Sequence, residues 1–388
     1  MISALHLFAN HKITGPAELA LETARWLPIA DPDVSCRFAS SAVPRTENRA
    51  PWLQDLARER GLPEAGWDDI TLPKHFAPIT ALRDVRRMIR RLRADPPQVI
   101  HTHTENDHLL AGLAARRLER PIPIVRTLYD GEPPRYKPRT WLSYGHLTSR
   151  LICLSAEVAR QMTEAPYNLP AERVTTLAPP IDTERFDPAR ELPNLRERFG
   201  IAADAPVYGI VARMQTHRRF EVLVEAMTTV ARERPEARAI IVGRGTNQET
   251  VARAPVRDAG LDEHVIFSGY LKGDDYVGVL KALDLKLFLV PGSDGTCRAV
   301  REALSMGAPV VAARRGMLPE IVRDGVTGRV IDDTPETLAA TILELLGDRE
   351  LRERLGRQAR EDAEQRFAFR AYARQVAAIY RTLPGLDG

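Results

Sequence analysis

Cysteine is scarce in this chain of 388 residues, which contains only three. Cys36, Cys153 and Cys297 are far apart and odd in number, and none has the spacing of a metal-ligand pair. This pattern argues against a disulfide framework and a zinc site, and it fits a reducing compartment.

Long apolar runs are also absent, since no segment contains about 18 consecutive apolar residues, the length that a spanning helix requires. The N-terminal sequence MISALHLFAN lacks the charged start and the small-residue cleavage site of a secretory signal. We therefore expect a cytoplasmic protein without a membrane-spanning helix.

The chain also lacks a large excess of positive or negative charge, because 55 basic and 52 acidic side chains leave a net charge of +3. Such a balance argues against nucleic acid as the main partner. The content of 44% hydrophobic and 28% charged residues is typical of a folded chain. A chain of this length exceeds one ordinary hydrophobic core, so we expect two domains.

Short apolar runs alternate with amphipathic stretches along the whole chain, which is typical of βα units with buried parallel strands. The fold class is therefore α/β. The expected strands are Ser3–Phe8, Val99–His101, Ile122–Thr127, Leu151–Leu154, Val174–Leu177, Val207–Ala212, Ala239–Val242, Val265–Ser268, Leu285–Leu289 and Pro309–Ala312. A stretch rich in proline and charge, 179–193, indicates the connection between the halves. One or two closing helices are expected from about residue 335.

The segment from Pro291 to Ile331 contains the most informative motif. A glycine-containing loop with Asp294 leads into a helix that contains Glu302, and Gly307 with Pro309 ends that helix before another apolar strand. The spacing places the two carboxylates about two turns apart on one side of the helix. Free backbone N–H groups at the start of such a helix can bind phosphate or sugar oxygens.

This motif resembles family 4 of the retaining glycosyltransferases, which have the GT-B architecture of two Rossmann-like domains facing each other across a cleft. The family pattern is an acidic residue, seven others and a glutamate, then a small-Gly-x-Pro-Val-Val turn, matched here by Asp294, Glu302 and MGAPVV. The resemblance implies that Glu302 binds the donor ribose and that Asp294 and the N–H groups of Gly295, Thr296 and Cys297 hold the transferred sugar. It also implies an acceptor domain over 1–182, a donor domain over 183–365, and a C-terminal helix over 366–388 that could cross back to the first domain.

Two departures from the family pattern leave the donor sugar open. The first acidic residue is usually glutamate and is aspartate here, one methylene shorter. The Gly-Phe-Gly that usually follows it is replaced by Gly295-Thr296-Cys297.

A basic loop after the strand Val207–Ala212 resembles the family's diphosphate-binding element. Arg213 matches the family arginine, Arg218 falls at the lysine position, and Arg219 replaces a glycine. Fixed cations at the end of a strand suit a departing diphosphate, because negative charge grows on its bridging oxygen as the glycosidic bond breaks. The alternative is that these are surface arginines of an ordinary loop.

In the first half, Gly15 precedes Pro16 at the start of a helix, and His103 follows a strand. The resemblance implies that Gly15 lies against the donor phosphates or the acceptor, and that His103 lies near the donor anomeric carbon. Both residues also have a structural interpretation, since the first βα turn of a Rossmann-like domain needs a small residue and a histidine at a strand end is often structural.

Gly243 and Gly245 follow a strand and resemble the family loop over the nucleotide base. Tyr270 stands where a base-flanking loop is expected. A GxG motif alone is weak, and its place between a strand and a helix gives it its value.

The stretch Ala81–Arg93 predicts an amphipathic helix with six arginines. We expect it to pack on its own sheet with solvated arginines. The alternative is a contact with an anionic membrane that carries a lipid acceptor.

Together with these motifs, the family resemblance implies a retaining, metal-independent glycosyltransferase without a cofactor, using a UDP-, GDP- or ADP-linked hexose as co-substrate. The expected acceptor is a saccharide, a lipid-linked glycan or a small polar molecule, with possible peripheral contact at the inner membrane face. The alternatives are an epimerase or hydrolase of nucleotide sugars with the same fold, and a catalytically silent nucleotide-sugar-binding subunit. Oligomeric state stays open.

Overall fold

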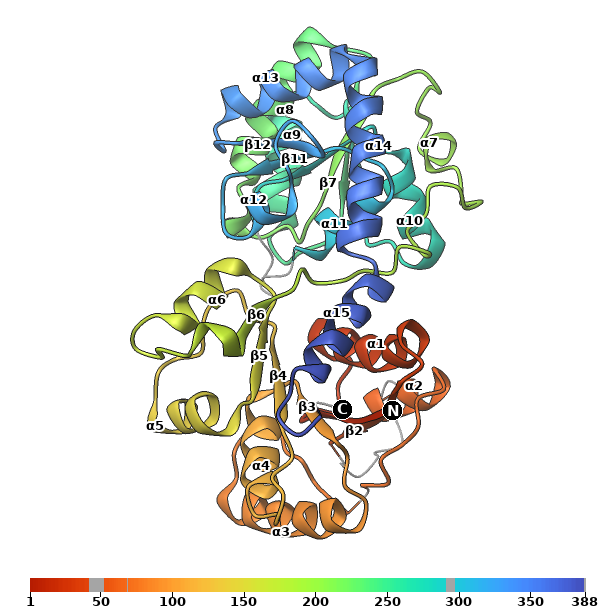
Figure 1. Ribbon diagram of the computed structural model, residues 1–388. Helices are drawn as coiled ribbons and strands as arrows, with labels where there is room; N and C mark the ends of the chain where they lie inside the picture. The colour runs from red at the N-terminus through yellow and green to blue at the C-terminus, as the bar shows by residue number, and fades with distance from the viewer. Residues whose placement is uncertain (42–51, 68, 291–296, 387–388) are drawn as a thin grey trace. The chain divides into compact units, whose positions relative to one another are not determined.

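The computed structural model describes residues 1–41, 52–67, 69–290 and 297–386 (Figure 1). The chain forms two units. The first, unit 1, comprises Met1–Pro180 together with Phe369–Gly388, and the second, unit 2, comprises Ile181–Ala368.

Unit 1 is built on a six-stranded parallel sheet with the order β2-β1-β3-β4-β5-β6. The strands are β1 (Ile2–Phe8), β2 (Val34–Ser40), β3 (Val99–Thr102), β4 (Ile124–Leu128), β5 (Arg150–Cys153) and β6 (Val174–Thr176). Strands β1, β3 and β4 are buried along almost their whole length, because helices cover both faces, and this explains their continuous apolar sequence.

The helices of unit 1 enclose hydrophobic cores on both faces of the sheet, and two of these cores contain residues of β1. Ala4 and Phe8 of β1 belong to the first core, and Leu5 and Leu7 belong to the second, as expected from strand alternation. The helices are α1 (Gly15–Ala30), α2 (Leu53–Glu59), α3 (Pro78–Ala94), α4 (Glu105–Ala115), α5 (Pro138–Trp141), α6 (Ala156–Thr163) and α15 (Phe369–Arg381).

The last helix, α15, belongs to unit 1 although the preceding 188 residues form unit 2. In Figure 1 it lies in blue beside the red α1, and its residues Tyr372, Val376 and Tyr380 are buried in the same core as the inner face of α1. Arg381 forms an ion pair with Asp31 at 2.5 Å, just after the end of α1. One face of the unit 1 sheet is therefore covered by the C-terminal end of the chain.

Unit 2 contains a second six-stranded parallel sheet with the order β12-β11-β10-β7-β8-β9. Its strands are β7 (Val207–Val211), β8 (Arg238–Val242), β9 (Val265–Gly269), β10 (Leu285–Phe288), β11 (Val310–Ala313) and β12 (Gly328–Ile331). Its helices are α7 (Leu195–Arg198), α8 (Phe220–Glu233), α9 (Ala254–Asp258), α10 (Gly273–Ala282), α11 (Arg298–Ser305), α12 (Leu318–Ile321), α13 (Pro335–Gly347) and α14 (Arg349–Arg366).

The direction of strand succession reverses in the middle of each sheet, between β1 and β3 in unit 1 and between β7 and β10 in unit 2. In open α/β sheets the loops on either side of such a reversal diverge and leave a crevice at the carboxyl ends of the strands. Each unit therefore has one edge of its sheet that is predisposed to bind a ligand.

The predicted α/β class with parallel sheets is confirmed, and each of the ten expected strands is present within two residues of its predicted bounds. Two strands, β2 and β12, were not predicted. The region from Pro335 onward contains three helices, α13, α14 and α15, so the expectation of one or two was wrong.

Candidate functional site

A pocket of about 910 Å³ lies in unit 2 at the carboxyl ends of β7, β8 and β10. Val211, Val242 and Phe288, at the ends of these three strands, line its floor. Its position is the crevice expected where the strand order reverses. Its described lining includes six cations, namely Arg185, Arg213, Arg218, Arg244, Lys272 and Arg298, and one carboxylate, that of Glu302. The pocket is therefore suited to an anionic ligand.

Arg213 and Arg218 both line the pocket, as the sequence suggested. Arg213 is exposed just after β7, whereas Arg218 is only 9% exposed and donates from Nη1 to the carbonyl oxygen of Val290 at 3.0 Å. The loop after β10 thus holds the second cation in place, whereas no hydrogen bond or ion pair of the Arg213 side chain is found among the described residues.

Arg219 does not line the pocket. It has a left-handed backbone, with φ of 60°, at the start of α8, and its guanidinium pairs with Asp333 at 3.2 Å. A left-handed conformation costs a residue with a Cβ about 1–2 kcal/mol relative to the right-handed one, which explains why glycine suits this position. The ion pair directs the side chain of Arg219 away from the pocket.

Glu302 lies on α11 and is 3% exposed, and its carboxylate is held from two sides. Tyr276 donates its hydroxyl to Oε2 at 2.5 Å, and Arg298 donates Nε to Oε1 at 2.8 Å. Burial and the neighbouring carboxylate raise the pKa of Tyr276 well above its usual value, so this residue stays a donor at neutral pH. Each carboxylate oxygen has a second lone pair, which leaves acceptor capacity for a ligand hydroxyl.

Gly243 and Gly245 let the loop after β8 approach the loop after β7. A Cβ on Gly243 would lie 2.2 Å from the carbonyl oxygen of Ala212, and one on Gly245 would lie 2.0 Å from that of Met214. Gly243 also has a φ of +135°, which residues with a side chain rarely adopt. The two glycines are therefore required by the shape of this wall.

Tyr270 is 57% exposed at the rim of the pocket, and two cations flank its ring. The guanidinium of Arg244 lies 4.9 Å from the ring centroid, and the amine of Lys272 lies 5.5 Å from it. These cation–π contacts hold an aromatic surface beside the glycine wall.

Cys297 lines the pocket and precedes α11 with a left-handed backbone, φ 48°. Asp294, Gly295 and Thr296 lie outside the described residues, so their predicted contacts with the sugar stay predictions. Tyr276 and Arg298, which fix the carboxylate of Glu302, were not predicted from the sequence.

Lys286 is a buried cation that the sequence analysis missed. It lies on β10 two residues before Phe288, its side chain is 0% exposed, and its amine has no hydrogen-bond partner among the residues that the structure describes. Burial lowers the pKa of Lys286 to about 7, against an opposing effect of Glu302. A lysine in an apolar strand therefore titrates near neutrality next to the pocket.

Lys286→Met is expected to raise the free energy of unfolding at pH 7 by about 4 kcal/mol, because a pKa that falls from 10.5 to about 7 on folding penalises the native state by 1.36 kcal/mol per unit. The penalty is full below pH 7 and disappears as the pH rises toward 10.5, so native stability should increase over this window while the stability of the variant should not. Calorimetric melts at pH 7 and pH 9 measure this. Lys281→Met, at an exposed position, is the control, and a loss of stability in Lys286→Met would contradict the prediction.

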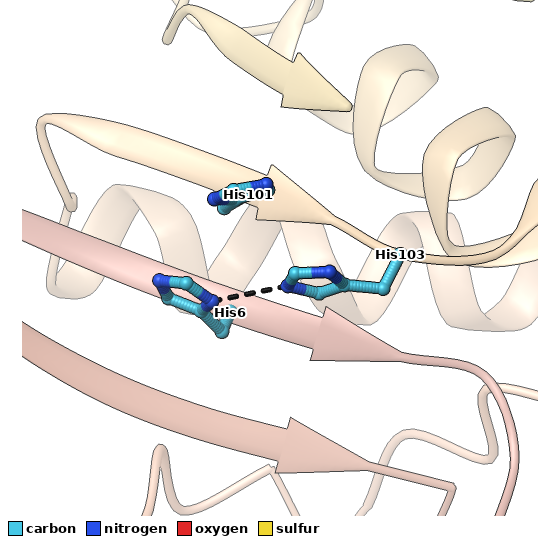
Figure 2. A group of neighbouring side chains, drawn as sticks. All are labelled: His6, His101 and His103. Atoms are coloured by element: carbon cyan, nitrogen blue, oxygen red, sulfur yellow. Dashed lines mark hydrogen bonds between the residues drawn. The ribbon is translucent and has the colours of Figure 1, made fainter. Parts of the chain in front are cut away.

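In unit 1, three histidine side chains gather where the strand order reverses (Figure 2). His6 is on β1, and His101 and His103 are on β3 or just after it; all three are buried. His6 Nδ1 lies 3.0 Å from His103 Nε2, and His103 Nδ1 lies 2.6 Å from the hydroxyl of Tyr129. The nitrogens of His101 are 2.7 Å from the hydroxyls of Tyr380 and Thr127.

These histidines offer nitrogen ligands within 4.8 Å of one another, but two of the three ring pairs are stacked, and the third, His6 with His101, is tilted by 38°. His101 and His103 have centroids 4.4 Å apart with an interplanar angle of 19°, and His6 and His103 are 5.2 Å apart at 21°. A histidine binds a metal along a lone pair in its ring plane, and nearly parallel planes direct these lone pairs side by side instead of toward one point. The geometry and the hydroxyl partners favour a buried hydrogen-bond network.

Burial lowers the pKa of His6 to about 3 and places the pKa values of His101 and His103 well below their usual range. The three rings are therefore neutral at pH 7. Asp107 lies at the same edge of the sheet. Its carboxylate accepts hydrogen bonds from the backbone N–H groups of Ala9 at 2.9 Å and His103 at 3.1 Å. Burial raises the pKa of Asp107 to about 6.

Of the predicted site residues, seven lie together at the unit 2 pocket, namely Arg213, Arg218, Gly243, Gly245, Tyr270, Cys297 and Glu302. His103 and Gly15 belong to unit 1. The ring of His103 is 2% exposed with both nitrogens hydrogen-bonded, and Gly15 is the first residue of α1 after its N-cap Thr14. Their contacts with a donor stay predictions.

Comparison with known families gives two matches that together span most of the chain. Residues 192–362 match the model described as glycosyl transferases group 1, and residues 21–185 match the one described as glycosyltransferase family 4.

Among curated proteins, the chain is 32% identical over 189 residues to the GDP-mannose-dependent alpha-(1-6)-phosphatidylinositol monomannoside mannosyltransferase of Mycolicibacterium smegmatis, covering 46% of this chain and 48% of that protein. It is 28% identical to the D-inositol 3-phosphate glycosyltransferase of Nocardia farcinica, covering 84% of this chain and 75% of the relative. The chain spans about half the length of several of the relatives that it matches.

Among solved structures, a glycosyltransferase from Rickettsia africae aligns with a TM-score of 0.77 at 17% identity and covers 98% of both chains. Anabaena Alr3699/HepE, solved in complex with UDP and glucose, aligns with a TM-score of 0.71 at 20% identity over 99% of this chain and 100% of its own. These similarities establish the fold.

Proposed function

Because this chain belongs to the group 1 glycosyltransferases with the GT-B fold, we propose that it transfers a hexose-type sugar from a nucleotide diphosphate donor to an acceptor hydroxyl. The observation that carries this proposal is the unit 2 pocket, in which six cations surround one buried, prepositioned carboxylate. A nucleotide sugar has the matching chemistry, since its diphosphate is anionic and its ribose presents hydroxyl donors.

In the proposed complex, Arg213 and Arg218 bind the diphosphate, and Glu302 accepts hydrogen bonds from the ribose hydroxyls. The nucleobase lies against the wall formed by Gly243, Gly245 and Tyr270. Donors such as GDP-mannose, used by the mannosyltransferase relative, and UDP-sugars, as in the HepE complex, both fit this description.

The proposed reaction proceeds with retention at the anomeric carbon, as the family resemblance implies. The bond from the anomeric carbon to the diphosphate oxygen breaks, and a bond to the acceptor oxygen forms on the same face. The acceptor hydroxyl proton passes to the departing phosphate oxygen. Arg213 and Arg218 stabilise the negative charge that develops on the diphosphate. These cations provide the charge that Mg²⁺ supplies in other transferases, so we propose that the reaction needs no metal.

A thermal-shift screen of the full chain against UDP, GDP, ADP and their sugars tests the donor assignment. A ligand that binds only the native state stabilises it by about 2.7 kcal/mol at a concentration 100 times its Kd, so the correct nucleotide should raise Tm with concentration. Arg213→Ala should reduce this shift, whereas Arg232→Ala, at an exposed position on α8 outside the pocket, should not. If no nucleotide changes Tm, the proposal fails.

Activity assays separate the proposed transferase from its alternatives. A new glycoside that forms only with acceptor present supports transfer, and its anomeric signal in NMR tests retention. Turnover of the donor alone would identify an epimerase or hydrolase, and donor binding without turnover across an acceptor panel would identify a silent binding subunit. Activity lost in EDTA and restored by Mn²⁺ would contradict metal independence.

A further inference from the structure

Large apolar side chains that are exposed in this protein concentrate in one region of unit 1. Eight such residues are found among the described part of the chain, and five of them lie in two segments, around the start of α3 and around α5. These are Phe76, Ile79, Leu82, Tyr136 and Trp141, with Ile79 at 87% exposure. We call these five residues and the cations beside them the basic apolar patch.

The outer face of α3 combines apolar and cationic side chains. Ile79, Leu82, Arg83, Arg86 and Arg90 are all exposed, and their spacing places them on one stripe of the helix. The helix packs through other residues, among them Met88 and Leu92, which are buried. The exposed stripe is therefore separate from the face by which α3 packs against the hydrophobic core.

The arginines of this stripe differ from those on its flank. Arg87 and Arg91 are bound to Asp69, one to its carbonyl oxygen and the other to its carboxylate at 2.8 Å. Arg86 and Arg90 have no ion pair among the residues that the structure describes, and Asp84, the one acidic residue within α3, is buried. The charge of the stripe is therefore left uncompensated by α3 itself.

The second segment adjoins the first. The guanidinium of Arg139 lies 5.4 Å from the ring centroid of Phe76, so α5 lies next to the residues that precede α3. This segment adds Tyr136 and Trp141, each about half exposed, and the exposed cations Arg135 and Lys137. Aromatic rings of this type prefer the boundary between water and lipid headgroups.

We propose that the basic apolar patch binds the surface of an anionic lipid bilayer. The apolar side chains enter the headgroup boundary, and the arginines bind lipid phosphates. A second copy of the chain is a poorer partner, because two such patches would bring like charges together. Nucleic acid is also a poorer partner, because its charged backbone offers no apolar surface to the highly exposed side chain of Ile79. None of the described helices is long and apolar enough to cross a bilayer, so the contact would be peripheral.

Sedimentation with lipid vesicles tests this proposal without relying on enzymatic activity. The full chain should bind vesicles of 30% phosphatidylglycerol in phosphatidylcholine and should bind vesicles of phosphatidylcholine alone at least about tenfold more weakly, with affinity falling in 0.5 M salt. Arg86→Glu with Arg90→Glu should lower the partition coefficient by about 30-fold or more, since each reverses an attraction to the surface. Ile79→Ser with Leu82→Ser should lower it about tenfold.

The matched control is Arg354→Glu with Arg357→Glu, which makes the same change in net charge at exposed positions on α14 of unit 2 and should leave binding within twofold of native. Near-equal binding of all variants, equal binding to neutral vesicles, or no binding would overturn the proposal. So would self-association that Ile79→Ser with Leu82→Ser abolishes in the absence of vesicle binding. Thermal melts confirm that each variant is folded, and an unchanged donor thermal shift keeps this test separate from the proposed function.

Discussion

Glu302→Ala is expected to lower kcat/KM for glycosyl transfer by about 10²–10⁴-fold, because the carboxylate would accept two hydrogen bonds from the ribose, each contributing about 1.5–3 kcal/mol to a charged acceptor. The substitution also leaves the buried hydroxyl of Tyr276 without its acceptor, which lies at 2.5 Å in the native chain. Calorimetry measures the loss of donor affinity, and steady-state kinetics measure the loss of kcat/KM.

Three further variants make this prediction specific. Glu302→Gln keeps the side-chain volume and one acceptor oxygen, so it should fold normally and still lose most of the affinity. Tyr276→Phe should weaken donor binding less, since it removes only the hydroxyl that positions the carboxylate and leaves the carboxylate itself in place. Glu225→Ala, at an exposed position on α8, should behave as native. Donor affinity and activity of Glu302→Ala within threefold of native would rule out the ribose assignment.

Lowering the pH from 7 to 5 is expected to destabilise unit 1 by about 7 kcal/mol. His6, His101, His103 and the buried His108 have folded pKa values far below 6.5, so below pH 6.5 the unfolded state binds four more protons than the native state. Each proton lowers the free energy of unfolding by about 1.36 kcal/mol per pH unit, or about 8 kcal/mol in total at pH 5. Asp107 acts in the opposite direction, because its raised pKa of about 6 adds about 1 kcal/mol over the same range.

Tryptophan fluorescence can follow this transition selectively, since all four tryptophans, Trp26, Trp52, Trp67 and Trp141, belong to unit 1. Urea titrations at pH 7, 6 and 5 should show a falling midpoint. His6→Gln should reduce the pH dependence by about 1.36 kcal/mol per pH unit, whereas His75→Gln, at an exposed position, should leave it unchanged. A midpoint that does not change between pH 7 and pH 5 would show that the rings are not buried and neutral.

Most of the fold could be predicted from the sequence because the central strands are short continuous apolar runs. The two missed strands, β2 and β12, each lie at one edge of a sheet, and their apolar pattern is weak. In β2, the exposed Ser35 and the partly exposed Arg37 interrupt the apolar pattern. Strand β12 is only four residues long and begins with a glycine, Gly328. A Cβ at this position would lie 1.9 Å from the carbonyl oxygen of Val310, so the position requires glycine.

Site residues could be predicted where a motif in the neighbouring sequence marks them. They could not be predicted where their role depends on contacts between distant parts of the chain. Glycines and cations at the ends of strands can be recognised from their neighbours in sequence, and the family models confirm the resemblance that these motifs suggested. Tyr276 reaches Glu302 across 26 residues, and His6 reaches His103 across 97, so no local pattern signals either contact. Lys286 is hidden in the run LKLF, where a buried strand suggests only apolar packing.

The return of α15 to unit 1 has a consequence for the order of events during synthesis. When residue 180 leaves the ribosome, the helix that buries Tyr372 and Tyr380 against the first sheet has not been made. Unit 2 is contiguous and can complete its core earlier. The N-terminal half of the polypeptide should therefore be the later of the two to reach its native state, and it should be open to proteases until the segment that contains Tyr380 has left the ribosome.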